Sequence, residues 1–129
     1  MTIQVLIADD QPHVRQALRL ILGLDPAITV VAEAATGVEA LTVCRSEVVD
    51  VVLMDNHMPG LSGIETSHQI TADPRLARVR VLLHTAFLTD DLVSAGLSAG
   101  ISGFLQKGVD PHTLLQSVHD VAPPLARAA

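Results

Sequence analysis

Three aspartates and a lysine are the residues whose types and positions point most directly to chemistry. Asp9 and Asp10 follow the first short apolar run of the chain, and Asp55 follows a central one. Lys107 ends another such run near the C-terminus. Short apolar runs rich in β-branched residues indicate buried strands, and ligands bind at the carboxyl ends of parallel strands. The sequence therefore predicts that these four groups meet at one edge of a sheet.

This combination of charges favours metal binding and phosphoryl chemistry. Three close carboxylates repel one another and need a counter-charge to stay ionised. Mg²⁺ meets that need, because it binds hard oxygen ligands such as carboxylates, waters and phosphate oxygens. Lys107 adds one further positive charge, which brings the site close to neutral. Asp55 can then attack phosphorus and form an acyl phosphate, while the hydroxyl of Thr85 can donate to a phosphoryl oxygen.

Apolar runs and helical patterns alternate along the chain and predict the elements that position these residues. Strands are expected at Ile3–Ala8, Ile28–Ala34, Val51–Met54, Val79–Thr85 and Ser102–Gln106. Helices are expected from Pro12 to about Leu24, Thr36 to about Val48, Gly63 to Ala72, Asp90 to Ala99 and Pro111 to Val121. Alternating strands and helices indicate an α/β fold with a parallel sheet covered on both faces. Right-handed crossovers and five strands favour a flavodoxin-like, doubly wound (βα)5 sandwich of strand order 2-1-3-4-5.

The composition fits one such domain with an aliphatic core. Of 129 residues, 49% are hydrophobic, yet the chain has only 2 Phe and neither Tyr nor Trp. The expected inner face of the second helix consists of Val38, Leu41, Thr42 and Val48. The single cysteine, Cys44, excludes an internal disulfide and is expected to be a small packed thiol on that helix.

Charge and hydropathy limit the possible partners. The net charge of −6, with no basic cluster, argues against a direct nucleic-acid surface. No leader pattern is present, and no apolar run approaches the roughly 18 residues of a membrane span. We therefore expect a cytoplasmic protein that does not bind a membrane.

The residues at the strand ends, taken together, resemble a known family. Asp-Asp follows the first strand, Asp-x-x-Met-Pro-Gly-x-x-Gly the third and Thr-Ala the fourth, while Phe-x-x-Lys lies in the fifth. Each motif alone is weak, but the set resembles the CheY-like receiver domain of two-component response regulators, from Ile3 to about Val121. Two runs, Val5–Gln11 and Val30–Ala34, are most similar to receivers of NarL/LuxR-type regulators.

The resemblance implies roles in phosphoryl transfer for Asp55, Lys107 and Thr85, and a switch role for Thr85 and Phe104. It makes Asp55 the phosphoacceptor and Lys107 the partner of the phosphoryl oxygens. Thr85 and Phe104 become a switch pair, in which Thr85 moves toward the phosphoryl group and Phe104 fills the vacated space. Phosphorylation adds roughly two negative charges, which could bias such an equilibrium.

The same resemblance implies a Mg²⁺ site. Asp10, Asp55 and the main-chain carbonyl of His57 would be its protein ligands, and Asp9 would act through metal-bound water. The His57 side chain could also modulate hydrolysis of the acyl phosphate, although a solvated loop histidine is an equally good interpretation. Gly108 stands where many receivers have Pro. A cis peptide bond after Lys107 would therefore cost far more free energy here than it does before Pro.

The resemblance also implies partners and boundaries. A sensor histidine kinase would donate the phosphoryl group, and activation would favour a homodimer. Residues 1–122 would form the receiver domain, and residues 123–129 a tail or the start of a linker. DNA would be bound, and transcription controlled, only through a helix-turn-helix output domain that this chain lacks. The domain would be no enzyme beyond catalysing its own phosphorylation and dephosphorylation.

Two alternatives remain open on the residues alone. A receiver-like interaction module could work without any phosphorylation, although its intact acidic set argues against this. A Mg²⁺-dependent phosphohydrolase would also use a nucleophilic Asp at a strand end. Such an enzyme usually has a second acid two residues later, and here that position is His57.

Overall fold

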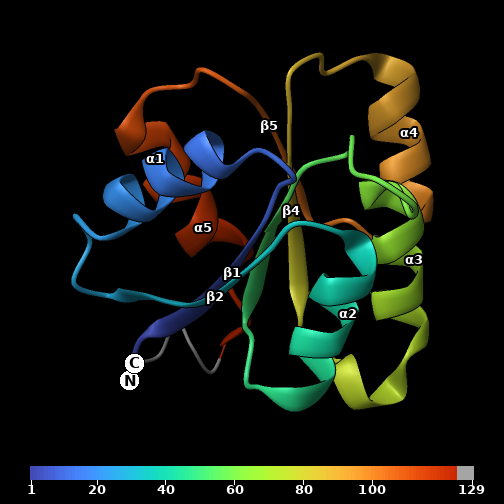
Figure 1. Ribbon diagram of the computed structural model, residues 1–129, viewed down its shortest axis with the longest axis horizontal. Helices are drawn as coiled ribbons and strands as arrows, with labels where there is room; N and C mark the ends of the chain where they lie inside the picture. Colours follow the sequence, from blue (N-terminus) through green and yellow to red (C-terminus); the bar gives the residue numbers. More distant parts are fainter. Residues whose placement is uncertain (125–129) are drawn as a thin grey trace.

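A parallel sheet forms the centre of the molecule in the computed structural model, which describes residues 1–124 (Figure 1). Its strands are β1 (Ile3–Ala8), β2 (Ile28–Ala34), β3 (Val51–Met54), β4 (Arg80–Thr85) and β5 (Gly103–Gln106). Their order is β2-β1-β3-β4-β5, and every neighbouring pair is parallel. The predicted doubly wound α/β fold and its strand order are therefore confirmed.

Helices cover both faces of this sheet. They are α1 (Pro12–Leu22), α2 (Gly37–Ser46), α3 (Gly63–Ala72), α4 (Asp90–Ser98), α5 (Pro111–Val121) and a short 3-10 helix, η1 (Pro74–Leu76). α1 and α5 lie on one face, and α2, α3 and α4 lie on the other (Figure 1). Across residues 1–124, every helix is too short or too polar to cross a membrane.

Two aliphatic layers hold the helices to the sheet. Successive strand residues point to opposite faces, so Ile7 and Leu53 pack under α1 and α5, whereas Leu6 and Met54 pack under α2 and α3. These four side chains are at most 1% exposed. A sheet buried on both faces is characteristic of parallel strands, and it makes the strand ends a rigid platform.

The element boundaries agree with the sequence analysis to within about two residues. α1 ends at Leu22 rather than near Leu24, and β4 and β5 each begin one residue later than expected. η1 was not predicted, although its start signal is present: Asp73 accepts a hydrogen bond from the backbone N–H of Arg75 next to Pro74. α5 ends at Val121, and of the tail expected at 123–129, residues 125–129 lie outside the described residues.

The inner face of α2 was predicted only in part: Leu41 is buried as expected, at 4% exposed, but the other three residues are not. Val38 and Val48 are 61% and 55% exposed, and Thr42 is also exposed. The buried residues are Gly37, Ala40, Leu41 and Cys44. This set keeps helical spacing but begins at Gly37, whose backbone lies too close to α3 for a side chain. Cys44 is the packed thiol that was expected, and burial raises its pKa to about 11.

Local hydrogen bonds fix the loop that joins β3 to α3. Ser62 and Glu65 form a reciprocal capping box, with bonds of 3.1 and 3.0 Å. The N–H of Gly63 donates to the carbonyl of Asn56 at 3.0 Å. A Cβ on Gly63 would overlap the carbonyl oxygen of Asp55 and would lie 2.8 Å from Cα of Asn56. The loop that follows Asp55 therefore requires glycine at this position.

Gly63→Ala tests this close approach. Because the obstacle is backbone, we expect the substitution to lower the free energy of unfolding by about 1–3 kcal/mol, measured by guanidinium denaturation. Gly23→Ala is the matched control, since its nearest atoms would lie at 3.2 and 3.5 Å and its φ is an ordinary −66°. Equal effects of the two substitutions would contradict the steric argument.

Candidate functional site

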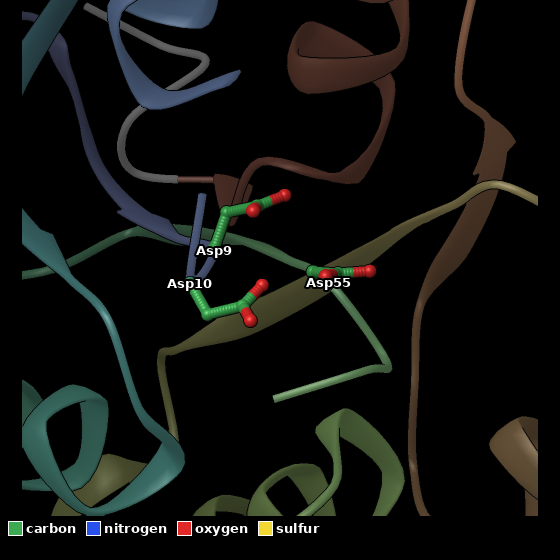
Figure 2. Close-up of side chains that lie close together, drawn as sticks. All are labelled: Asp9, Asp10 and Asp55. Carbon is green, nitrogen blue, oxygen red and sulfur yellow. The ribbon is translucent and has the colours of Figure 1, made fainter. Parts of the chain in front are cut away.

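The carboxyl groups of Asp9, Asp10 and Asp55 lie side by side where β1 and β3 end (Figure 2). Ala8 and Met54 are register partners, and the N–H of Asp55 donates to the carbonyl of Ala8 at 2.9 Å. Carboxylate oxygens from the three aspartates lie within 4.8 Å of one another. Asp9 and Asp55 are 1% and 4% exposed, whereas Asp10 is exposed. The fold thus brings together the three acids selected from the sequence.

Lys107 reaches this cluster from the end of β5. Its Nζ lies 3.0 Å from Oδ2 of Asp9 and 3.6 Å from Oδ1 of Asp55. Its backbone N–H donates to the carbonyl of Thr85 at 2.7 Å, which fixes the start of the β5–α5 loop. Asp9 Oδ2 has no hydrogen bond of standard geometry within the described chain, so its contact with the ammonium is an ion pair. Lys107 is thus shared between two carboxylates.

The electrostatics of Asp55 reflect an excess of negative charge. Burial raises the pKa of Asp55 above its ordinary value, and the neighbouring Asp9 and Asp10 raise it further. Lys107 and the backbone N–H of His57 oppose this shift of the pKa without reversing it. One ammonium facing three carboxylates leaves the cluster short of positive charge. Hard oxygen donors at this spacing suit a small divalent cation such as Mg²⁺.

Arg15 is a residue of the site that sequence reasoning missed. Its guanidinium donates to the main-chain carbonyl of Asp9 at 2.7 Å and pairs with Glu33 on β2 at 3.1 Å. The carboxylate of Asp9 also accepts from the N–H of Gln11 at 2.9 Å. Together these bonds hold the β1–α1 turn that orients Asp9 and Asp10. An arginine one turn into a helix carries no sequence signal for this role.

Thr85 and Phe104 lie on the same face of neighbouring strands. Thr85 is register partner to Gln106, and Leu83 to Phe104, so the two side chains are diagonal neighbours on β4 and β5. Thr85 is 0% exposed, and its hydroxyl has no hydrogen-bond partner anywhere in residues 1–124. Phe104 is half-buried. A buried, unpaired hydroxyl carries a free-energy cost and leaves a donor available to a ligand.

The two histidines near the site occupy different environments. His57 is exposed in the loop after Asp55, and the contact seen there is made by its backbone N–H. His84 precedes Thr85, points to the opposite face of the sheet and is 6% exposed. Burial, aided by the Lys107 ammonium, lowers the pKa of His84 to about 4.

The turn after Lys107 is formed by a glycine with a positive φ and contains no cis peptide bond. No peptide bond is cis in the part of the chain that is described, so the bond between Lys107 and Gly108 is trans. Gly108 has a φ of +96°, a left-handed conformation that glycine adopts without steric cost.

Comparison with known proteins agrees with this geometry. Residues 5–119 match the response regulator receiver domain, so the chain belongs to that family. Its curated relatives include the response regulator UvrY of Escherichia coli, 37% identical over 92% of this chain and 54% of the relative. The chain thus spans about half the length of the curated relatives it matches.

Solved structures refine the family assignment. The receiver domain of the response regulator NarL from Mycobacterium tuberculosis superposes with a TM-score of 0.88 and 29% identity, covering 99% of this chain and 98% of the other. A CheX–CheY complex with BeF3 and Mg²⁺ from Borrelia burgdorferi gives a TM-score of 0.84 and 28% identity, covering 92% and 87%. The chain is a receiver domain of the NarL/LuxR type, and the predicted resemblance is confirmed.

His84 makes the stability of the domain dependent on pH. Because the folded-state pKa lies below the ordinary 6.5, the unfolded chain binds a proton first as the pH falls. Stability is therefore complete above about pH 6.5 and is lost as the pH falls toward 4. Between about pH 7 and about pH 5 the loss from this group should approach 2 kcal/mol.

Denaturant unfolding of His84→Leu at both pH values measures this contribution. Because the variant lacks the titrating group, its free energy of unfolding should fall less between the two pH values. His68→Leu, which removes an exposed histidine from α3, should keep the slope of the original protein. If the free energy of unfolding depended on pH with the same slope in all three proteins, His84 would be excluded as the cause.

Proposed function

We propose that this receiver domain accepts a phosphoryl group on Asp55 from a sensor histidine kinase and so switches a surface read by a partner. The observation that carries the proposal is the buried Asp55 carboxylate, 3.6 Å from the Lys107 ammonium, in a cluster with more negative than positive charge. A cluster of that kind favours the binding of a cation and, through the cation, of a phosphoryl group. Membership of the receiver family supports the same role.

The residues fit Mg²⁺ as the cation. Asp10, Asp55 and the main-chain carbonyl of His57 would hold it, and Asp9 would contact its bound water. Two observations support this cation site. Carboxylate oxygens of the three aspartates lie within 4.8 Å of one another, and the pKa of Asp55 is raised by burial and by its acidic neighbours. When bound, Mg²⁺ would neutralise the carboxylates and offer positions for phosphoryl oxygens. A relative at 28% identity forms a complex that contains Mg²⁺.

The side chains of the chain itself would carry out the transfer. A carboxylate oxygen of Asp55 attacks phosphorus, and the new P–O bond forms as the P–N bond to the kinase histidine breaks. The released imidazole takes up a proton. Lys107 is held by Asp9 at 3.0 Å and only loosely by Asp55 at 3.6 Å. It can therefore pair with a phosphoryl oxygen without leaving Asp9, which stabilises the charge of the transferred group.

Thr85 would couple the phosphoryl group to the rest of the fold. Its hydroxyl lacks a partner within the described residues, and a phosphoryl oxygen is a strong acceptor. Donation to that oxygen satisfies the hydroxyl and draws Thr85 toward Asp55. Phe104, its diagonal neighbour on β5, then gains room to move. This differential contact is what a two-state switch requires.

The wider setting belongs to the same proposal. We infer a cytoplasmic regulator that dimerises on activation and binds DNA through an output domain outside this chain. The relatives support this, because the match covers only 54% of their length and they include a transcriptional regulatory protein of Bacillus subtilis, 34% identical. The receiver itself would catalyse only its own phosphorylation and dephosphorylation, with the exposed His57 positioning or obstructing the attacking water.

Intact mass after incubation with acetyl phosphate and Mg²⁺ tests the nucleophile. We expect one phosphoryl adduct, absent from Asp55→Asn and absent when EDTA removes the metal. The decay rate of the adduct in His57→Ala tests the modulating role, which an unchanged lifetime would exclude. If no adduct forms while Mg²⁺ binding is measurable, a phosphorylation-independent interaction module becomes the better description.

Thr85→Val tests the unpaired hydroxyl. Removing a buried donor that lacks a partner should raise the free energy of unfolding by about 1 kcal/mol. Thr66→Val is the matched control, because Thr66 is also 0% exposed but donates to the carbonyl of Ser62 at 2.8 Å. Thr66→Val should therefore lower the free energy of unfolding by about 1 kcal/mol. Thermal unfolding compares the two, and a loss of stability in Thr85→Val would contradict the assignment.

A further inference from the structure

A side chain from α1 holds the peptide unit that joins Asp9 to Asp10. Nη1 of Arg15 donates to the main-chain carbonyl of Asp9 at 2.7 Å. Peptide units are planar, so a fixed Asp9 carbonyl also fixes the N–H and the Cα of Asp10. The Arg15 side chain is only 18% exposed, and a hydrogen bond from a charged donor is stronger than one between neutral groups. This bond therefore sets the direction in which the chain presents Asp10.

Asp10 depends on its backbone because its own side chain is unsupported. The neighbouring Asp9 is anchored at several groups. Its N–H donates to the carbonyl of Ala34 at 3.0 Å, and its Oδ1 accepts from the N–H of Gln11 at 2.9 Å. Its Oδ2 pairs with Lys107 at 3.0 Å. Asp10, in contrast, is exposed, and its carboxylate has no hydrogen bond or ion pair within the described part of the chain.

The start of α1 lacks the side-chain cap that the other α-helices have. α2, α3, α4 and α5 each begin with a side chain that accepts from an N–H of the first turn. Gln11, the residue before α1, forms no such bond with its side chain. The junction between β1 and α1 is therefore tied by two bonds to Asp9, one from the Gln11 N–H and one from Arg15.

Glu33 on β2 holds the guanidinium of Arg15 in place. Its Oε1 accepts from Nε of Arg15 at 3.1 Å, and its Oε2 accepts from Nε of Arg19 at 2.7 Å. Glu33 is the register partner of Ile7, whose side chain lies on the face of the sheet that α1 covers. Within residues 1–124, Arg15 forms an ion pair with Glu33 and none with the three carboxylates of the site. Arg15 thus contacts the site through its backbone.

We infer that Arg15 is a positioning residue for Asp10: it places the Asp10 carboxylate by holding the Asp9 carbonyl, and so raises the affinity of the site for Mg²⁺. The inference rests on the proposed function for the identity of the cation. Its direction is opposite to the effect of charge, because a positive side chain close to the site would by Coulomb repulsion weaken the binding of Mg²⁺. The sign of the change on removing Arg15 therefore separates positioning from charge.

Titration with Mg²⁺ alone, followed by backbone-amide NMR, measures this affinity. Arg15→Met removes the donors and the charge but keeps an unbranched side chain, and we expect the Kd for Mg²⁺ to rise roughly tenfold. Arg19→Met is the matched control, because Arg19 carries the same charge and bonds the same Glu33 without bonding Asp9. Its Kd should stay within about twofold of the original. A lower Kd in Arg15→Met, or an equal change in both variants, would overturn the inference.

Hydrogen exchange in the metal-free protein gives a second readout. The Gln11 N–H, which is bonded to the Asp9 carboxylate, should exchange roughly fivefold faster in Arg15→Met and at the original rate in Arg19→Met. The amide of Val52 in β3, a residue that is 0% exposed, reports any change in global stability. If Gln11 exchange relative to Val52 exchange were unchanged in Arg15→Met, the inference would be wrong even with a raised Kd.

Arg15→Lys replaces Arg15→Met if the latter does not fold. Lysine keeps the charge but lacks the planar group that bonds the Asp9 carbonyl and Glu33 together, so the Kd should again rise and Gln11 exchange should again be faster. The original protein provides the test of the proposed function. If it bound no Mg²⁺, the proposed cation site would be contradicted, and Gln11 exchange would still decide whether Arg15 holds the turn.

Discussion

Repulsion among three carboxylates is the constraint on which this structure depends. Asp9 and Asp55 are buried at adjacent strand ends, with Asp10 beside them, and Lys107 is the one ammonium in contact among the described residues. Such a cluster would separate if its backbone could move. The parallel ladder between β1 and β3 prevents this, because it is buried on both faces by aliphatic side chains. The fold therefore holds an unfavourable charge in place, and under the proposed function a cation and a phosphoryl group would relieve it.

Side-chain packing differs between the central strands and the edge of the sheet at β4 and β5. The central strands carry fully buried residues on both faces, so they cannot shift without loss of packing. At the end of β4, the hydroxyl of Thr85 lacks a hydrogen-bond partner within residues 1–124, and Phe104 on β5 is only half-buried. Under the proposed function, a phosphoryl group on Asp55 would therefore act on Thr85 and Phe104 and leave the central strands as they are.

The strands and their order were predictable from sequence because each strand is an apolar run bounded by Asp, Gly or Pro. The acids at the strand ends were found for the same reason, since topology alone brings them together. The inner face of α2 was predicted only in part, because the helix turns Gly37 toward the side chains of Thr66 and Leu61, whereas hydrophobicity favoured Val38. Arg15 was missed because its role depends on the reach of a long side chain to the carbonyl of Asp9. Periodicity carries no information about either effect.

The feature that the proposed switch would use is a local deficit at Thr85. Its hydroxyl is buried and lacks a hydrogen-bond partner within residues 1–124. If the hydroxyl were already satisfied, a phosphoryl oxygen would gain little by attracting it. This deficit costs stability in the resting domain, and a phosphoryl oxygen that accepts from the hydroxyl would recover part of that cost. A switch needs two states close in free energy, and under the proposed function the unpaired hydroxyl would reduce the difference between them.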